Sequence, residues 1–261
     1  MNLHPLSAFL QPWFAAGTPD LPRLNAEASQ RGLTSGSGAP LSFVPPPADA
    51  EAYEERACLS GEIATRPDNP HDLFNALIWL SFPRTKAAFN RRHVAALKAA
   101  REQGNAARGP LRDALTQFDE CGVVMAGSRP DLWSALCAHR WREIFVERRE
   151  ELLRTSRFVV FGHASHDALA APIVGLCGKA MFVDVDDAWL NLPEAAALAA
   201  LDAHLATWFD HAQFSPRDWQ PLPLLGIPGA TADNERPDYY DDARQFRPAR
   251  TMRPGSSPGN R

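Results

Sequence analysis

Apolar residues recur along the middle of the chain in two patterns, short unbroken runs and longer runs with helical spacing. The unbroken runs CGVVMAG, RFVVFG and AMFVDV span residues 121–127, 157–162 and 180–185 and are typical of buried strands. The segments between them carry apolar side chains three or four positions apart, as amphipathic helices do. This alternation predicts an α/β fold, with a parallel or mixed sheet flanked by helices.

Spacing and capping signals together predict where the helices lie. We expect helices over residues 109–120, 130–153, 165–178 and 192–209, the third broken or kinked by Pro172 and the last capped by Asn191. The run LPLLGIPG, residues 222–229, is expected to form a short fourth strand or an extended edge. The predicted sheet therefore has about three to four strands.

The stretch DNPHDLFNALIWLSFPRTKAAFNRRH, residues 68–93, predicts two helices joined by a short turn. Asn69 is a suitable N-cap and Pro70 suits the first helical position. Pro83 ends the first helix, because proline disfavours helical backbone in the residue before it. We therefore expect an N-terminal helical hairpin over residues 69–104.

Proline content indicates how the chain is divided. Residues 1–48 are rich in proline and are expected to be extended or irregular. Residues 49–250 are expected to form a single α/β domain that includes the hairpin. Residues 251–261, rich in proline, glycine and serine, are expected to be a disordered tail.

Charge and hydropathy exclude some classes of partner. The net charge of −4 gives no global field that would attract nucleic acid or an anionic membrane, so neither partner is expected. No apolar run approaches the about 20 residues that span a bilayer. One local group of basic residues is interpreted as a solvated helix face: Arg84, Lys86, Arg91 and Arg92. A small-molecule ligand is the expected partner class, and the oligomeric state stays open.

The cysteines indicate the compartment. There are four, none in a C-x-x-C pair or in a Cys/His spacing typical of structural zinc. They are interpreted as buried thiols in a reducing environment, and the N-terminus lacks the basic start of a secretory signal. These features predict a cytoplasmic location.

Polar residues that follow the predicted strands are the first candidates for a site. Ligands of open α/β sheets bind beyond the carboxyl ends of the strands. The residues expected there are Gly127, Ser128, His163, His166, Asp167, Asp184, Asp186 and Asp187. Such histidines and carboxylates could hold a divalent metal or form an acid/base pair. The open alternative is that Asp167 and Asp187 cap helices and that His163 hydrogen-bonds a loop.

The hairpin supplies the second group of candidates. Its Asn75, Asn90 and His93 need buried partners, and we expect at least two of Asp119, Glu120 and His163 to lie near them. Asp119 and Glu120 precede the first strand, so the hairpin would have to bring partners to that end. We assign as candidate catalytic residues His93, His163, Asp119 and Glu120, and as candidate binding residues His71, Asp72, Asn75 and Asn90. The alternative for His93 is a structural core histidine.

Several stretches of the chain resemble a known family. They are YEERACLSGEIATRPDNPHDLFNALIWLSFPRTKAAFNRRH, LTQFDECGVV, FGHA and LPLLGIPG…YYDDARQFRPAR. Together they resemble an uncharacterised proteobacterial family, domain of unknown function 3025, over roughly residues 43–250. One departure is Ala230, where the resemblance leads us to expect an aromatic residue. The resemblance implies a soluble bacterial protein and implies no activity.

Missing motifs narrow the expected function. The chain has no G-x-G-x-x-G after a strand, no P-loop, no G-x-S-x-G and no H-E-x-x-H. The leading hypothesis is a hydrolase with a pocket lined by His, Asp, Glu and Asn, which a divalent metal could assist. The alternative is a non-catalytic binding or scaffold protein whose polar residues are helix caps and buried hydrogen bonds. A metal-dependent nuclease built on His71, Asn90 and His93 is a third, weaker hypothesis.

Overall fold

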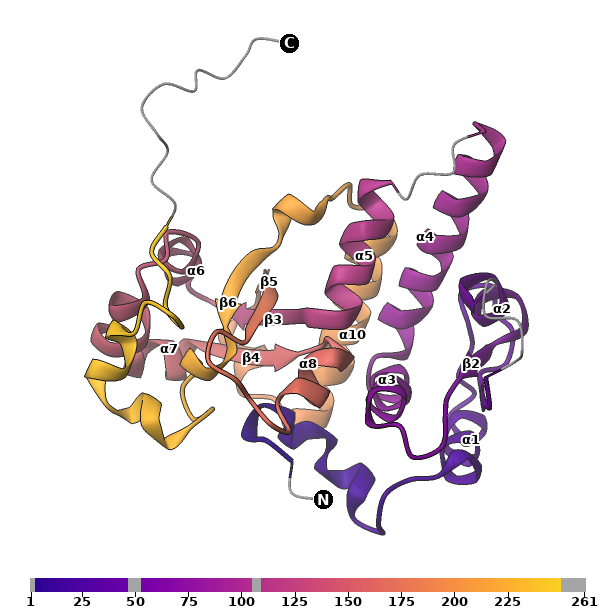
Figure 1. The fold of residues 1–261 in the computed structure, drawn as a ribbon, viewed down its shortest axis with the longest axis horizontal. Coiled ribbons are helices and arrows are strands. Elements are labelled where there is room, and N and C mark those ends of the chain that lie inside the picture. Colours follow the sequence, from indigo (N-terminus) through magenta and orange to yellow (C-terminus); the bar gives the residue numbers. More distant parts are fainter. Residues whose placement is uncertain (1–2, 47–52, 105–108, 250–261) are drawn as a thin grey trace.

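A four-stranded mixed sheet forms the centre of the computed structural model, which describes residues 3–46, 53–104 and 109–249 (Figure 1). The strand order is β4–β3–β5–β6. β3 (Gly122–Gly127) is parallel to β5 (Cys177–Asp184), whereas β4 (Ser156–Val160) is antiparallel to β3 and β6 (Gln220–Pro223) is antiparallel to β5. The predicted mixed α/β sheet is therefore confirmed. A small parallel sheet joins β1 (Ser42–Val44) to β2 (Glu62–Ala64).

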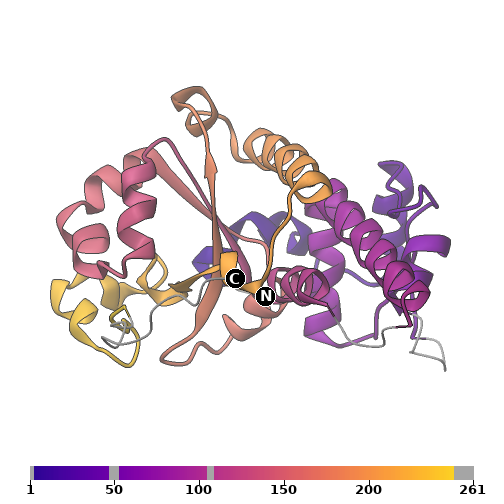
Figure 2. The same cartoon turned by 90° about the horizontal axis from the view of Figure 1, so that it is seen from above.

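Helices cover both faces of the larger sheet (Figure 2). One face packs against α3 (Pro70–Ser81), α4 (Pro83–Glu102), α5 (Pro110–Cys121) and α10 (Glu194–His211). The other packs against α6 (Pro130–Cys137), a π-helical turn (Glu143–Glu147) and α7 (Arg149–Thr155). Every β3 residue is buried, with Val124 and Ala126 facing the first core and Val123 and Met125 the second. This explains why the strand reads as an unbroken apolar run.

The predicted helical hairpin is confirmed as α3 and α4. The side chain of Asn69 caps α3 by accepting from the Asp72 N–H at 3.0 Å. Phe82 precedes α4 and makes no side-chain cap. Asp202 of α10 takes that role across a long sequence separation, accepting from the N–H groups of Arg84 and Thr85 at 3.1 and 2.8 Å.

The described part of the front of the chain, residues 3–46, contains regular elements that its proline content did not predict. It forms a 3₁₀ helix (Pro5–Phe14), α1 (Leu21–Gln30) and β1. Asp20 caps α1 by accepting from the Arg23 N–H at 3.0 Å. The segment also buries six side chains in the first core, and this burial outweighs the proline content: Leu10, Phe14, Leu24, Ala28, Leu41 and Phe43. The predicted tail, residues 251–261, lies outside the described residues.

Two long predicted helices are broken. The helix over 130–153 is interrupted at His139, whose φ of 54° is left-handed, and then by the π-helical turn. The helix over 165–178 is limited to α8 (His163–Ala168), because Pro172 and Gly175, with φ of 89°, lie in the loop that follows.

Two smaller predictions also need correction. β6 begins two residues before residues 222–229 and gives way to a 3₁₀ turn at Leu224. α10 begins after Pro193, and Asn191 instead ends the short helix α9 (Asp187–Leu190). One further helix, α2 (Tyr53–Ser60), precedes the hairpin. None of the described helices is both long and apolar enough to cross a lipid bilayer.

A buried histidine anchors the N-terminal 3₁₀ helix to the sheet. His166 Nδ1 lies 2.7 Å from the Ser7 hydroxyl, and its Nε2 lies 3.0 Å from the carbonyl oxygen of Val160. With Nε2 donating to that carbonyl, Nδ1 accepts from Ser7. Burial lowers the pKa of His166 to about 3, so the folded protein holds the ring neutral.

This anchor predicts a pH dependence of stability. The unfolded chain protonates His166 below its ordinary pKa of 6.5, whereas the folded chain resists until about 3. The free energy of unfolding should therefore fall as the pH drops from 6.5, by at most about 1.4 kcal/mol per pH unit from this residue. The His166→Asn protein should have a lower free energy of unfolding than the parent at pH 7. Between pH 7 and pH 5 its free energy of unfolding should fall by less than that of the parent. Urea titrations at both pH values test this, and equal losses in the two proteins would contradict it.

The remote cap gives a second prediction. Asp202→Ala leaves the N–H groups of Arg84 and Thr85 without their acceptor and should lower the free energy of unfolding by about 1–3 kcal/mol. Burial raises the pKa of Asp202, but an Asn side chain keeps only one of the two oxygens that accept from Arg84 and Thr85. Asp202→Asn should accordingly cost less than Asp202→Ala in the same urea titration. Equal losses in both variants would show that the cap does not matter.

Candidate metal centre

A polar cluster forms where the chain enters β3. Because β4 is antiparallel to β3, the carboxyl end of β4 lies beside the amino end of β3. The Gly122 carbonyl oxygen accepts from the N–H of Gly162 at 2.9 Å. Asp119 and Glu120 lie near the end of α5, just before this point, and His163 opens α8 just after it. The strand pairing thus brings His163 to the two carboxylates.

Glycine is required at position 162 for this close approach. A Cβ at Gly162 would lie 2.5 Å from the backbone nitrogen of Cys121 and closer still to the carbonyl oxygen of Glu120. Both are backbone atoms, so a rotamer change cannot relieve the contact. Gly162 therefore sets how near His163 comes to Glu120.

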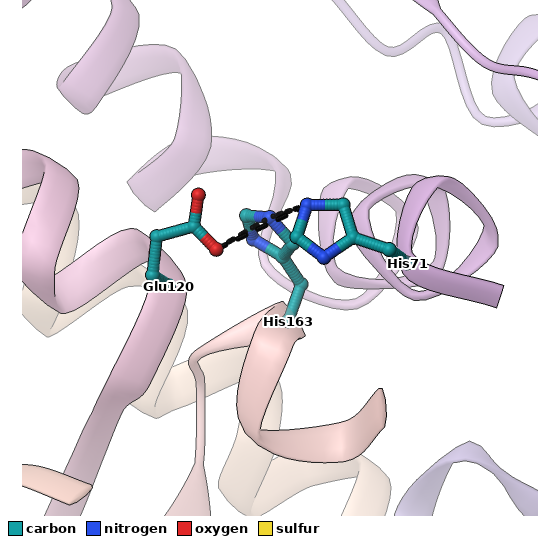
Figure 3. A group of neighbouring side chains, drawn as sticks. All are labelled: His71, Glu120 and His163. Carbon is teal, nitrogen blue, oxygen red and sulfur yellow. Dashed lines mark hydrogen bonds and ion pairs between the residues drawn. The ribbon is translucent and has the colours of Figure 1, made fainter. Parts of the chain in front are cut away.

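Three donor atoms from three elements converge in the cluster (Figure 3). His163 Nε2 lies 3.2 Å from His71 Nε2 and 3.3 Å from Glu120 Oε2, and the last two atoms are 4.0 Å apart. Donors that each lie about 2.1 Å from a tetrahedral zinc ion are about 3.4 Å apart. The two separations from His163 Nε2 are close to this value. The third, between His71 Nε2 and Glu120 Oε2, would reach it with a small movement of these two half-exposed side chains.

Burial sets the protonation of the cluster. It lowers the pKa of His163 to about 4, which leaves the imidazole neutral and able to offer a lone pair at neutral pH. It also raises the pKa of Glu120, and the charge of Asp119 adds to that effect. A cation among these atoms would favour the ionised Glu120 and so offset this cost.

A partly buried ion pair lies behind His163. Asp119 Oδ2 is 3.8 Å from His163 Nδ1, and Asp119 Oδ1 is 2.5 Å from the ammonium of Lys86. Burial works to raise the pKa of Asp119, but the charge and hydrogen bond of Lys86, together with the charges of His163 and His93, hold that pKa below its usual range. Lys86 also donates to Asn75 Oδ1 at 2.9 Å, and Asn75 donates to the Tyr53 hydroxyl at 3.3 Å.

Lys86 was assigned to a solvated basic face, and that interpretation is wrong. Its side chain is only 4% exposed, with the ammonium 5.4 Å from the centre of the Trp79 ring. The sequence does contain a signal for this burial. Lys86 lies three, four and seven positions before Phe89, Asn90 and His93, so all four share one side of a helix. All four are buried on one side of α4.

The remaining hairpin candidates lie in different places. Asn90 donates to the Glu54 carbonyl oxygen at 3.0 Å and accepts from the Gly36 N–H at 3.2 Å. Asp72 accepts from the backbone and guanidinium of Arg66 at 2.8–2.9 Å. These two residues hold neighbouring segments of the chain in place and do not join the donor atoms. His93 is buried, and its electrostatic effect favours the ionised form of Asp119.

The other strand-end candidates do not meet His163. Asp184 ends β5 level with Gly127, at the opposite edge of the sheet. Asp186 caps α9 by accepting from the Trp189 N–H at 2.8 Å. The expectation that all of these residues lie at one end of the sheet is wrong. β4 runs antiparallel to β3, so the residues that follow β4 lie at the opposite end from those that follow β3 and β5. His166 faces Ser7 instead.

Comparison with known proteins gives one match. The family described as protein of unknown function (DUF3025) matches residues 41–250. The chain belongs to this family. The resemblance predicted from the sequence is therefore confirmed. No curated protein matches the chain, and no solved structure does. Because the DUF3025 description names no activity, the function has to be argued from the cluster itself.

The glycine at the start of α8 yields a prediction for the site. Gly162→Ala forces the Cys121 and His163 backbones apart and should lower the free energy of unfolding by about 1–3 kcal/mol. Gly109→Ala is the control, because a Cβ at Gly109 meets no atom within 4 Å. Thermal and urea unfolding of both variants test this. A Gly162→Ala protein as stable as Gly109→Ala would contradict the close packing.

Proposed function

We propose that the protein is a metal-dependent hydrolase whose divalent cation is held by His71, His163 and Glu120. Two imidazoles and one carboxylate are a donor set used by catalytic zinc sites, which keep a fourth position for water. His71 and Glu120 are 38% and 39% exposed, so that position faces solvent, whereas His163 is 5% exposed. A bound divalent cation supplies a nucleophile by lowering the pKa of its water to about 7.

The residues behind the donors support this proposal. Histidine ligands generally direct their second nitrogen at a carboxylate or carbonyl group, which fixes the ring orientation. Asp119 lies on that side of His163, and Lys86 holds its charge. We infer that Asp119 positions His163 and that Lys86 positions Asp119.

One observation favours this function over a scaffold. A scaffold needs its polar residues to be used up as caps and loop contacts, as Asn69, Asn90 and Asp202 are. Nitrogen atoms of two histidines and an oxygen of Glu120 instead face one another, within 4.8 Å, from three separate elements. The nuclease hypothesis gains no such support, because Asn90 contacts backbone groups elsewhere. A cytoplasmic location stays a prediction.

Metal binding tests the proposal directly. Zinc and manganese titrations by calorimetry should show one site per chain, and His71→Ala should weaken binding at least tenfold. His71 is half-exposed, so its loss should leave the fold intact. His204→Ala, at an exposed position of α10, is the matched control and should bind as the parent does.

The outcomes separate the hypotheses. Equal affinity in His71→Ala and His204→Ala would contradict the metal centre. Binding in the parent protein should be accompanied by chelator-sensitive hydrolysis of activated esters or phosphodiesters. Metal binding without such hydrolysis would favour the non-catalytic binding protein.

A further inference from the structure

A cavity runs along one side of α10. Its volume is about 1220 Å³, and residues 195–210 of α10 form one wall. At 1.5 Å per residue this wall is about 22 Å long. The other sides are formed by the N-terminal 3₁₀ helix, the loop that follows α1 and the turn between α3 and α4. None of His71, Glu120 and His163 lines the cavity, so it is separate from the candidate metal centre.

Apolar side chains line much of this cavity. Phe9, Trp13 and Leu198 are half-buried in its walls. The Phe9 ring packs edge-on against Phe82 of the α3–α4 turn, with ring centroids 6.1 Å apart. α10 presents alanine side chains to the cavity at positions four residues apart, and their small size leaves the space open: Ala195, Ala199 and Ala203. An elongated apolar group therefore fits along this wall.

Several polar side chains of the lining already have partners within the protein. Ser35 and Thr207 donate to backbone carbonyl groups at 2.6 and 3.0 Å. Asp210 accepts from Arg91 at 2.6 Å, and Asp202 caps α4. A ligand rich in hydroxyl groups would therefore find few partners here.

Two arginines remain available at the turn between α3 and α4. Arg31 donates through Nη1 to the carbonyl oxygen of Leu80 at 2.8 Å, which holds its guanidinium near the end of α3. Arg84 lies in the first turn of α4. Its guanidinium favours the ionised form of Asp202 but forms no hydrogen bond or ion pair within the described part of the chain. A guanidinium has five N–H donors, so both arginines can bind an anionic group.

The charges of the lining limit the ligand further. Two guanidinium groups can hold one carboxylate through charge-assisted hydrogen bonds. A ligand with several negative charges would also meet Asp202 and Asp210, which would repel it. A sugar would bury hydroxyl groups against the alanine and leucine side chains of the walls, at a cost for each unsatisfied group. A single carboxylate on a long apolar body satisfies all of these constraints.

We propose that this cavity binds a long-chain carboxylate, the class to which free fatty acids belong. The carboxylate accepts from the guanidinium groups of Arg31 and Arg84, and the alkyl chain packs on the alanine wall of α10, Phe9 and Leu198. This site goes beyond the proposed metal centre and does not depend on it, because no donor residue of that centre lines the cavity.

The first test compares a carboxylate with its neutral ester. 11-(Dansylamino)undecanoic acid, a fluorescent long-chain carboxylate, should bind the full-length parent at one site per chain, and its methyl ester should bind at least tenfold more weakly. Arg84→Gln should weaken binding of the acid about tenfold and leave binding of the ester unchanged. Arg154→Gln, at an exposed position of α7 outside the cavity, is the matched control and should bind both probes as the parent does. Equal binding of acid and ester, or equal affinity of Arg84→Gln and Arg154→Gln for the acid, would overturn the carboxylate site.

A second pair of variants locates the alkyl chain. Ala199→Trp fills the cavity from an exposed position of α10 and should weaken binding of both probes at least tenfold. Ala196→Trp, also exposed on α10 but outside the cavity lining, should bind both probes as the parent does. Thermal unfolding of both variants checks that the fold is intact. Probe binding that Ala199→Trp leaves unchanged would place the probe elsewhere and overturn the inference, as would a parent protein that binds neither probe.

Discussion

The antiparallel pairing of β4 with β3 decides where the candidate metal centre of this protein lies. It returns the chain to the entrance of β3, so that His163 arrives beside Asp119 and Glu120. Had β4 run parallel, His163 would have met Asp184 at the opposite edge. Gly162 makes the return close enough for donor atoms to approach one another, since any side chain there would press on the backbone of Cys121. The hairpin then adds His71 from the third side. The cluster therefore depends on three features: the direction of β4, the glycine at position 162 and the start of α3.

The ion pair between Lys86 and Asp119 is costly, and its position explains why the fold keeps it. Moving two charges out of water costs several kcal/mol for each ion, and their attraction offsets this only with good geometry. Lys86 has that geometry, with contacts to Asp119, Asn75 and the Trp79 face. An apolar pair of similar volume could fill the space between α4 and α5 at less cost. An apolar pair could not place a carboxylate beside His163. The ion pair is therefore better explained by a role in the candidate metal centre than by a role in core packing.

The sequence predicted the local features of the fold and missed those that depend on distant contacts. β3 and β5 follow from continuous apolar runs, and α3 from its cap and prolines, because these signals lie within a few residues. The direction of β4 is not encoded in such a window, so the sequence predicted that His163 would share one end of the sheet with Asp184, whereas the structure places it beside Asp119 and Glu120. The burial of Lys86 depends on α5 and was hidden behind its charge, although its spacing from Asn90 and His93 contained the information. Residues 1–48 read as irregular because proline was weighed above the apolar spacing of α1.

The first turn of α3 carries both structural contacts and one residue of the candidate metal centre. Asn69 and Pro70 start the helix, and Asp72 ties down the preceding loop through Arg66. These contacts fix the direction in which His71 points, although His71 itself is half-exposed and makes little contribution to the core. A change at the cap should therefore alter the metal centre and the stability of the fold together, whereas a change at His71 should alter the metal centre alone. The helix start is thus a part of the fold on which the proposed metal centre depends.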